Sequence, residues 1–194
     1  MSNPIFIEIG TSDFDNLDSL LDEGWRGFFI EPIPEYLKSL QQKVSSPERD
    51  ATFLNVAVSD KNGYNIMTYV DPKTVKQQWI RGISHLNSDS SNLINKNNEQ
   101  GYDLGDIKQI SVPTVTLDWL IQLIDVKSID MLRIDVEGHE LNILQNYSWS
   151  IKPKRIKVEH KFIDKKNLLD LLVTNGYSVL DVGDDFYCIH NEEL

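Results

Sequence analysis

Carboxylates stand at or near the ends of several short apolar runs of this chain. The runs are rich in β-branched and aromatic residues, which indicates buried strands. A carboxylate accepts hydrogen bonds and donates none, so it suits the binding of hydroxyls or cations, and it can also accept a proton during catalysis. The carboxylates in question are Glu8, Glu31, Asp135 and Glu159. Their positions predict a binding or acid–base site at the strand ends.

The densest group of charges is the segment Asp135-Val136-Glu137-Gly138-His139-Glu140. Such a density of carboxylates needs a cationic substrate, a metal ion or neighbouring lysines to balance it. Asp135 directly follows the apolar Ile134 and is therefore the candidate expected to point inward. Glu140 is expected to be a favourable charge in the first turn of the following helix.

The first strand is followed by a glycine and three polar residues. Gly10 permits close approach of a ligand to the backbone. Thr11, Ser12 and Asp13 are expected either to contact that ligand or to cap the next helix. Phe14 stands where a further glycine would complete a dinucleotide-binding GxGxxG motif. The turn is therefore a weaker cradle for a pyrophosphate than that motif provides.

Glu31 ends the second apolar run, about 20 residues after Gly10, which is where nucleoside-binding sheets place an acid for the ribose hydroxyls. The alternative is a solvated carboxylate at a strand end. The match to Gly10 favours the ribose role.

Strands and amphipathic helices alternate along the chain, which predicts an α/β fold with a mostly parallel sheet and helices on both faces. The last two strands form a hairpin and bring an antiparallel strand into the sheet. Strands are expected at 5–9, 27–31, 52–59, 107–115, 129–135, 155–160, 177–181 and 186–190. Helices are expected at 13–23, 34–40, 117–124, 138–147 and 168–172.

The chain has 194 residues, which predicts a single domain over 1–194. Residues 71–106 are rich in Asn, Ser, Gly and Asp and are expected to form a polar insertion or a lid. The net charge of −11 argues against nucleic acid or an anionic membrane as a partner. The lone Cys188 and the absence of a signal-peptide pattern predict a cytoplasmic location.

Five segments together resemble the FkbM family of class I S-adenosylmethionine-dependent methyltransferases. They are Glu8-Ile9-Gly10, Glu31-Pro32, residues 55–60 (NVAVSD), residues 116–120 (TLDWL) and residues 129–140 (IDMLRIDVEGHE). The resemblance implies a Rossmann-like, mostly parallel seven-stranded sheet with an antiparallel last strand. Arg133 stands where the family pattern has a lysine, so the charge is kept but the geometry changes.

The resemblance also implies S-adenosylmethionine as cofactor and assigns residues to it. Glu8, Gly10, Thr11, Ser12 and Asp13 would face the methionine part. Glu31 and the adjoining Pro32 would lie at the ribose. Ile33 or Ala57 would flank the adenine, with Asn55 and Ser59 as polar contacts, and Asp135 would lie near the sulfonium.

The implied reaction is O-methylation of a hydroxyl on a sugar or another small, polar metabolite or glycan. A hydroxyl acceptor must lose its proton, which calls for a general base or a metal ion. The candidates for this role are Asp135, Glu159, His160 and His85. Asp135, Glu159 and His160 would also hold Mg²⁺ if their side chains converge.

Two other functions fit part of the pattern. An NAD(P)-dependent oxidoreductase would also use Glu31, although the GxGxxG motif is missing. A non-catalytic module that binds S-adenosylmethionine would keep the same fold without turnover.

Overall fold

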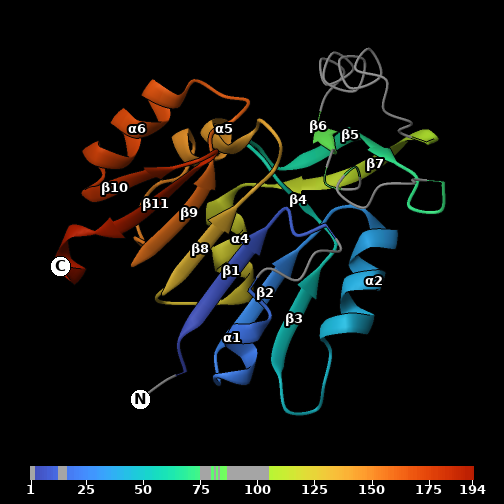
Figure 1. The fold of residues 1–194 in the computed structure, drawn as a ribbon, viewed down its shortest axis with the longest axis horizontal. Helices are drawn as coiled ribbons and strands as arrows, with labels where there is room; N and C mark the ends of the chain where they lie inside the picture. The colour runs from blue at the N-terminus through green and yellow to red at the C-terminus, as the bar shows by residue number, and fades with distance from the viewer. Residues whose placement is uncertain (1–2, 13–16, 75–79, 81, 83, 87–104) are drawn as a thin grey trace.

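The computed structural model describes residues 3–12, 17–74, 80, 82, 84–86 and 105–194. Its main sheet has seven strands in the order β10-β11-β9-β8-β1-β2-β3 (Figure 1). The strands are β1 (Ile5–Ile9), β2 (Arg26–Ile30), β3 (Asp50–Leu54), β8 (Met131–Ile134), β9 (Arg155–Glu159), β10 (Tyr177–Val182) and β11 (Asp185–His190). Neighbours pair in parallel except at β11, which is antiparallel to both β9 and β10. The predicted α/β fold is confirmed.

Helices cover the two faces of this sheet. On one face lie α4 (Leu117–Ile124), α5 (Glu140–Gln145) and α6 (Lys165–Thr174), whose apolar side chains join the largest core cluster. On the other face, α1 (Ser19–Asp22) and α2 (Pro34–Val44) pack on β1 and β2. The chain ends in a short 3₁₀ helix, Asn191–Glu193.

The helix starts follow local chemistry. The hydroxyl of Thr116 accepts a hydrogen bond from the Trp119 N–H at the start of α4, and Asp164 accepts one from Asn167 at the start of α6. Pro34 occupies the first turn of α2, where its missing N–H costs nothing. These elements begin close to where the sequence predicts them.

A second, four-stranded sheet has the order β4-β7-β5-β6. Its strands are β4 (Ala57–Val58), β5 (Gly63–Val70), β6 (His85–Leu86) and β7 (Ile107–Val115). Strand β5 was not predicted from the sequence, and residues 52–59 were predicted to form one strand. That segment divides: its first part is β3 of the main sheet, and β4 pairs with β7 in the second. Ala57, Met67 and Val112 of the second sheet pack against Ile33 and Tyr36, at the start of α2.

Other boundaries differ from the predictions. The helix expected at 13–23 is the shorter α1, and residues 13–16 of the prediction lie outside the described residues. Most of the insertion predicted at 71–106 also lies outside them. Within the described part of the chain, no helix has the length and apolar character needed to cross a membrane.

Candidate active site

A pocket lies at the carboxyl ends of β1, β2 and β8, with the second sheet as its opposite wall. Open α/β sheets bind ligands at this edge. The main-sheet side and the turns after it supply Ile9, Gly10, Ser12, Ile30, Glu31, Pro32, Asp135, Val136 and Glu137. The segment leading into the second sheet, that sheet and the loop before β6 supply Val56, Ala57, Val58, Met67, Gly82, Ser84 and Leu86.

Gly10 lets two strands meet at the floor of this pocket. Its φ is +80°, and a Cβ atom at this position would lie 1.8 Å from the backbone oxygen of Asp135. The Gly10 N–H donates to the Ile30 carbonyl at 3.1 Å, and the Asp135 N–H donates to the Ile9 carbonyl at 3.0 Å. The backbone of the first turn therefore touches both β2 and the segment after β8.

Glu31 joins the two loops that border the pocket. It is 4% exposed; its Oε2 accepts a hydrogen bond from the Ser12 N–H at 2.8 Å and its Oε1 accepts one from the Ile33 N–H at 2.7 Å. Each carboxylate oxygen has two lone pairs, so the same group can accept further hydrogen bonds from ligand hydroxyls.

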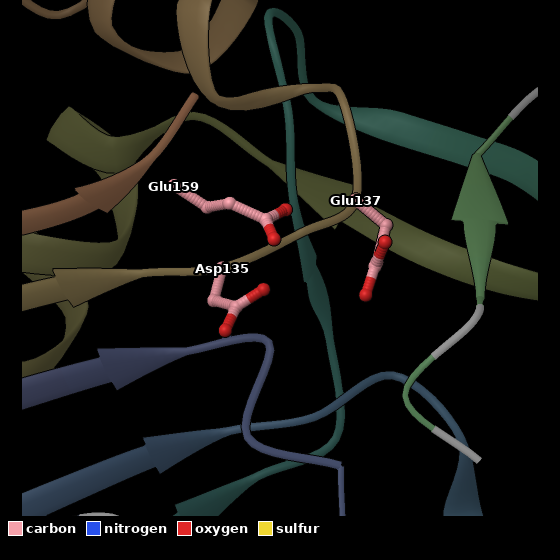
Figure 2. Close-up of side chains that lie close together, drawn as sticks. All are labelled: Asp135, Glu137 and Glu159. Carbon is pink, nitrogen blue, oxygen red and sulfur yellow. The ribbon is translucent and has the colours of Figure 1, made fainter. Parts of the chain in front are cut away.

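Three carboxylates converge beside Glu31 and Gly10. Asp135, Glu137 and Glu159 each place an oxygen so that all three atoms lie within 4.8 Å of one another. Figure 2 shows Glu159 reaching from the end of β9 toward Asp135, with Glu137 extending from the loop after β8. The Oε2 atom of Glu159 is buried and has no hydrogen-bond partner among the described residues. The arrangement favours a cation or a proton in this space.

Burial and mutual repulsion favour the protonated forms of this cluster. Burial, reinforced by the charges of Glu159 and Asp135, raises the pKa of Glu137 to about 9. Burial also raises the pKa of Glu159 to about 8, with Asp135 adding to the shift. The pKa of Asp135 is raised by burial as well, although Arg133 opposes this. The site therefore carries protons at neutral pH that an entering cation would displace.

This cluster predicts a pH-dependent stability. Between the ordinary pKa of 4.5 and the folded value near 9, the unfolded chain loses the Glu137 proton while the folded chain keeps it, so stability falls as pH rises. Glu137→Gln removes this penalty. We expect its stability gain over wild type to grow from pH 5 to pH 9 by at least about 1.4 kcal/mol, the free-energy equivalent of one pKa unit.

Urea unfolding at the two pH values measures this gain. The exposed Glu192 supplies the control Glu192→Gln, whose small effect on the free energy of unfolding should be the same at pH 5 and pH 9. A constant gain for Glu137→Gln would contradict the prediction.

Arg133 anchors the cluster from beneath. Glu8 and Arg133 face each other across β1 and β8. The guanidinium donates to Glu8 Oε1 at 2.8 Å and to Asp135 Oδ2 at 2.7 Å. Glu8 is 0% exposed and Arg133 is 7% exposed. Glu8, which the resemblance assigned to the methionine part, therefore supports the floor through Arg133.

Four other described residues that were predicted for the cofactor do not line the pocket. The Thr11 hydroxyl donates to the Ile30 carbonyl at 3.3 Å, and Ile33 is buried against α2 and the second sheet. Asn55 donates to the carbonyls of Glu31 and Pro32, both at 2.9 Å, and so holds the turn after β2. Ser59 bonds to Asp60 and His139. Asp13 lies outside the described residues.

The two predicted histidines bond to groups other than the three carboxylates. The Nε2 of His160 lies 3.1 Å from Asp181 Oδ1, and its ring packs on Phe186. His85 is 3% exposed, and its Nδ1 lies 2.9 Å from the Glu137 carbonyl. The set expected for a metal, with His160 in it, is not brought together; Glu137 stands beside Asp135 and Glu159 instead.

The fold is similar to that of class I methyltransferases. By structure, the chain is similar to magnesium protoporphyrin IX methyltransferase (ChlM) from Synechocystis PCC 6803 with bound SAM, at a TM-score of 0.52 and 11% identity, over 97% of this chain and 70% of that one. It is also similar to a ribosomal protein L11 methylase from Lactobacillus delbrueckii subsp. bulgaricus, at a TM-score of 0.45 and 9% identity, over 97% and 69%. No curated protein matches the chain by sequence.

The family model of the methyltransferase FkbM domain matches residues 8–179. The chain therefore belongs to the FkbM methyltransferase family. This range runs from β1 into β10, so it includes the whole pocket described above.

Proposed function

We propose that the protein is an S-adenosylmethionine-dependent O-methyltransferase, and that the donor binds in the pocket between the main sheet and the second sheet. The observation that carries the proposal is the buried Glu31 on the same pocket wall as Gly10 and the carboxylates Asp135 and Glu137. Glu31 would accept the ribose hydroxyls, and Val56, Ala57 and Val58 would form the apolar wall beside the adenine.

The pocket fits the charge of the donor. When bound, S-adenosylmethionine supplies a methyl group on a sulfonium cation. Asp135 and Glu137 line the pocket, and the buried Oε2 of Glu159 lies in the same acidic cluster without a partner among the described residues. Carboxylates in a partly dry site attract a positive charge more strongly than they do in water.

The same cluster accounts for the acceptor's proton. The acceptor would be a polar hydroxylated metabolite or glycan, whose oxygen gains the methyl group and loses its proton. Glu159, Glu137 and Asp135 are the candidates to take that proton, because a raised pKa makes a carboxylate a stronger base. In this proposal His160 and His85 hold neighbouring groups and do not take the proton.

Glu31→Ala tests the donor site. We expect S-adenosylhomocysteine to stabilise the wild-type protein against heat by about 2.7 kcal/mol at 100-fold excess over Kd, and we expect Glu31→Ala to lose most of this effect. Thermal unfolding with and without the ligand measures it. The control is Glu35→Ala, which removes an exposed glutamate from the first turn of α2.

NAD⁺ and NADP⁺ serve as parallel ligands in this measurement. Stabilisation by a nicotinamide dinucleotide alone would contradict the proposal. Stabilisation by S-adenosylhomocysteine without methyl transfer to any hydroxylated acceptor in a screen would favour a non-catalytic binding module.

A further inference from the structure

Glu140 is a carboxylate enclosed by the protein. It is the first residue of α5 and is 1% exposed. Its Oε1 accepts hydrogen bonds from the Val136 N–H at 2.8 Å and the Gly138 N–H at 3.2 Å, and its Oε2 accepts from Gly138 at 3.0 Å. Its side chain thus folds back over the loop that precedes its own helix.

That loop has an unusual backbone. Glu137 has a φ of +57° and Gly138 a φ of +104°. A positive φ is strained for a residue with a Cβ, and such strain persists only where surrounding contacts fix it. Two side chains provide such contacts. Glu140 accepts hydrogen bonds from the N–H groups of Val136 and Gly138, on either side of Glu137, and His85 Nδ1 lies 2.9 Å from the Glu137 carbonyl oxygen.

The strained conformation sets the direction of the Glu137 side chain. Asp135, Val136 and Glu137 all line the pocket, and Figure 2 shows the Glu137 carboxylate near those of Asp135 and Glu159. A relaxed backbone at Glu137 would turn this side chain elsewhere. The bonds of Glu140 and His85 thus fix the loop conformation in which the Glu137 carboxyl group lines the pocket, where a cationic ligand would favour its charged form.

We propose that Glu140 is a positioning residue, which clamps the 136–138 loop so that Glu137 faces the donor's sulfonium and the pocket prefers the charged donor over the neutral product. This inference rests on the proposed function. S-adenosylmethionine and S-adenosylhomocysteine differ by the methyl group and its positive charge. The Kd of S-adenosylhomocysteine divided by the Kd of S-adenosylmethionine, called the Kd ratio below, therefore reports the contribution of the carboxylates.

Two variants separate the effect of the length of the Glu140 side chain from the effect of its charge. Glu140→Asp keeps the charge, but it is one methylene too short to reach Val136 and Gly138. Glu140→Gln loses the charge and the contact between Oε2 and the Gly138 N–H, but an amide oxygen at the Oε1 position can still accept from both N–H groups. We expect calorimetric titration to show the Kd ratio falling about tenfold in Glu140→Asp and staying near wild type in Glu140→Gln.

The reverse order would overturn the inference, because it would mean that Glu140 acts through its charge. Equal weakening of both ligands with an unchanged ratio would overturn it too, because that is the signature of a purely structural role. Wild-type protein that binds neither ligand would instead overturn the proposed function, and the inference with it.

A second readout does not depend on Glu140→Asp folding. The amide protons of Val136 and Gly138 bond to a carboxylate, and charge-assisted bonds are shorter and stronger than neutral ones. In Glu140→Gln, we expect NMR to show both amide protons moving upfield while those in α6 stay in place. Unchanged shifts at both positions would contradict the clamp.

Discussion

Arg133→Met is expected to lower the free energy of unfolding by about 3–5 kcal/mol, the usual cost of removing one partner from a buried ion pair. The guanidinium bridges Glu8 and Asp135 at 2.8 and 2.7 Å. Methionine fills a similar volume without the charge, so Glu8, which is 0% exposed, loses the cation that neutralises it. Urea unfolding at neutral pH measures the loss.

The double variant Glu8→Gln/Arg133→Met tests the cause. Replacing both members of a buried pair is often close to neutral, because neither charge of the pair is left without its counterion. Asp135 also loses the guanidinium, but its side chain is 28% exposed, so it costs less to leave unpaired than the fully buried Glu8. We therefore expect the double variant to be more stable than Arg133→Met alone. If the two substitutions simply add their costs, the pair is not coupled and the prediction is wrong.

Arg133→Lys addresses the departure from the family pattern. Lysine keeps the positive charge, but it is a point charge and not a planar fork that donates to two carboxylates at once. The structure gives the reason for arginine at this position, since one guanidinium holds Glu8 beneath the floor and Asp135 at its surface.

The main sheet could be predicted because its strands carry a strong apolar pattern. Ile7, Ile9, Phe28 and Ile30 are buried in the core, as the runs at 5–9 and 27–31 indicate. Strand β5 gives no such signal, because Tyr64 and Ile66 are exposed and its polar residues interrupt the alternation. β5 pairs with β7, which follows it in the chain only after residues 71–106, and a local sequence pattern does not predict a contact between segments so far apart.

The site was predictable in outline but not in detail. Glu31 and Asp135 follow buried strands, so chain position alone brought them to the pocket edge. The role of Glu137 depends on a positive φ that residue types do not reveal before the loop is seen. From its place in the sequence, Glu140 is expected to be an exposed charge in the first turn of a helix. Its role in holding the 136–138 loop follows only from its burial and from its hydrogen bonds to Val136 and Gly138.

Gly10→Ala is expected to cost about 2–5 kcal/mol of stability, from backbone strain together with overpacking, and to weaken S-adenosylhomocysteine binding about 100-fold or more. The new Cβ would lie 1.8 Å from the Asp135 oxygen and 3.0 Å from Val136 Cγ1. The Asp135 backbone cannot move away freely, because its own N–H donates a hydrogen bond to the Ile9 carbonyl. The ends of β1 and β8 must therefore separate at the pocket floor.

Gly24→Ala is the matched control for this prediction. Gly24 has almost the same φ, +84° against +80°, but among the described residues no atom beyond its chain neighbours lies within 4 Å of the added Cβ. It therefore incurs the backbone strain alone, about 1–2 kcal/mol, and should leave ligand binding unchanged. Unfolding and calorimetric titration of both variants separate strain from collision. Equal effects on binding would mean that the contact between Gly10 and Asp135 does not shape the pocket.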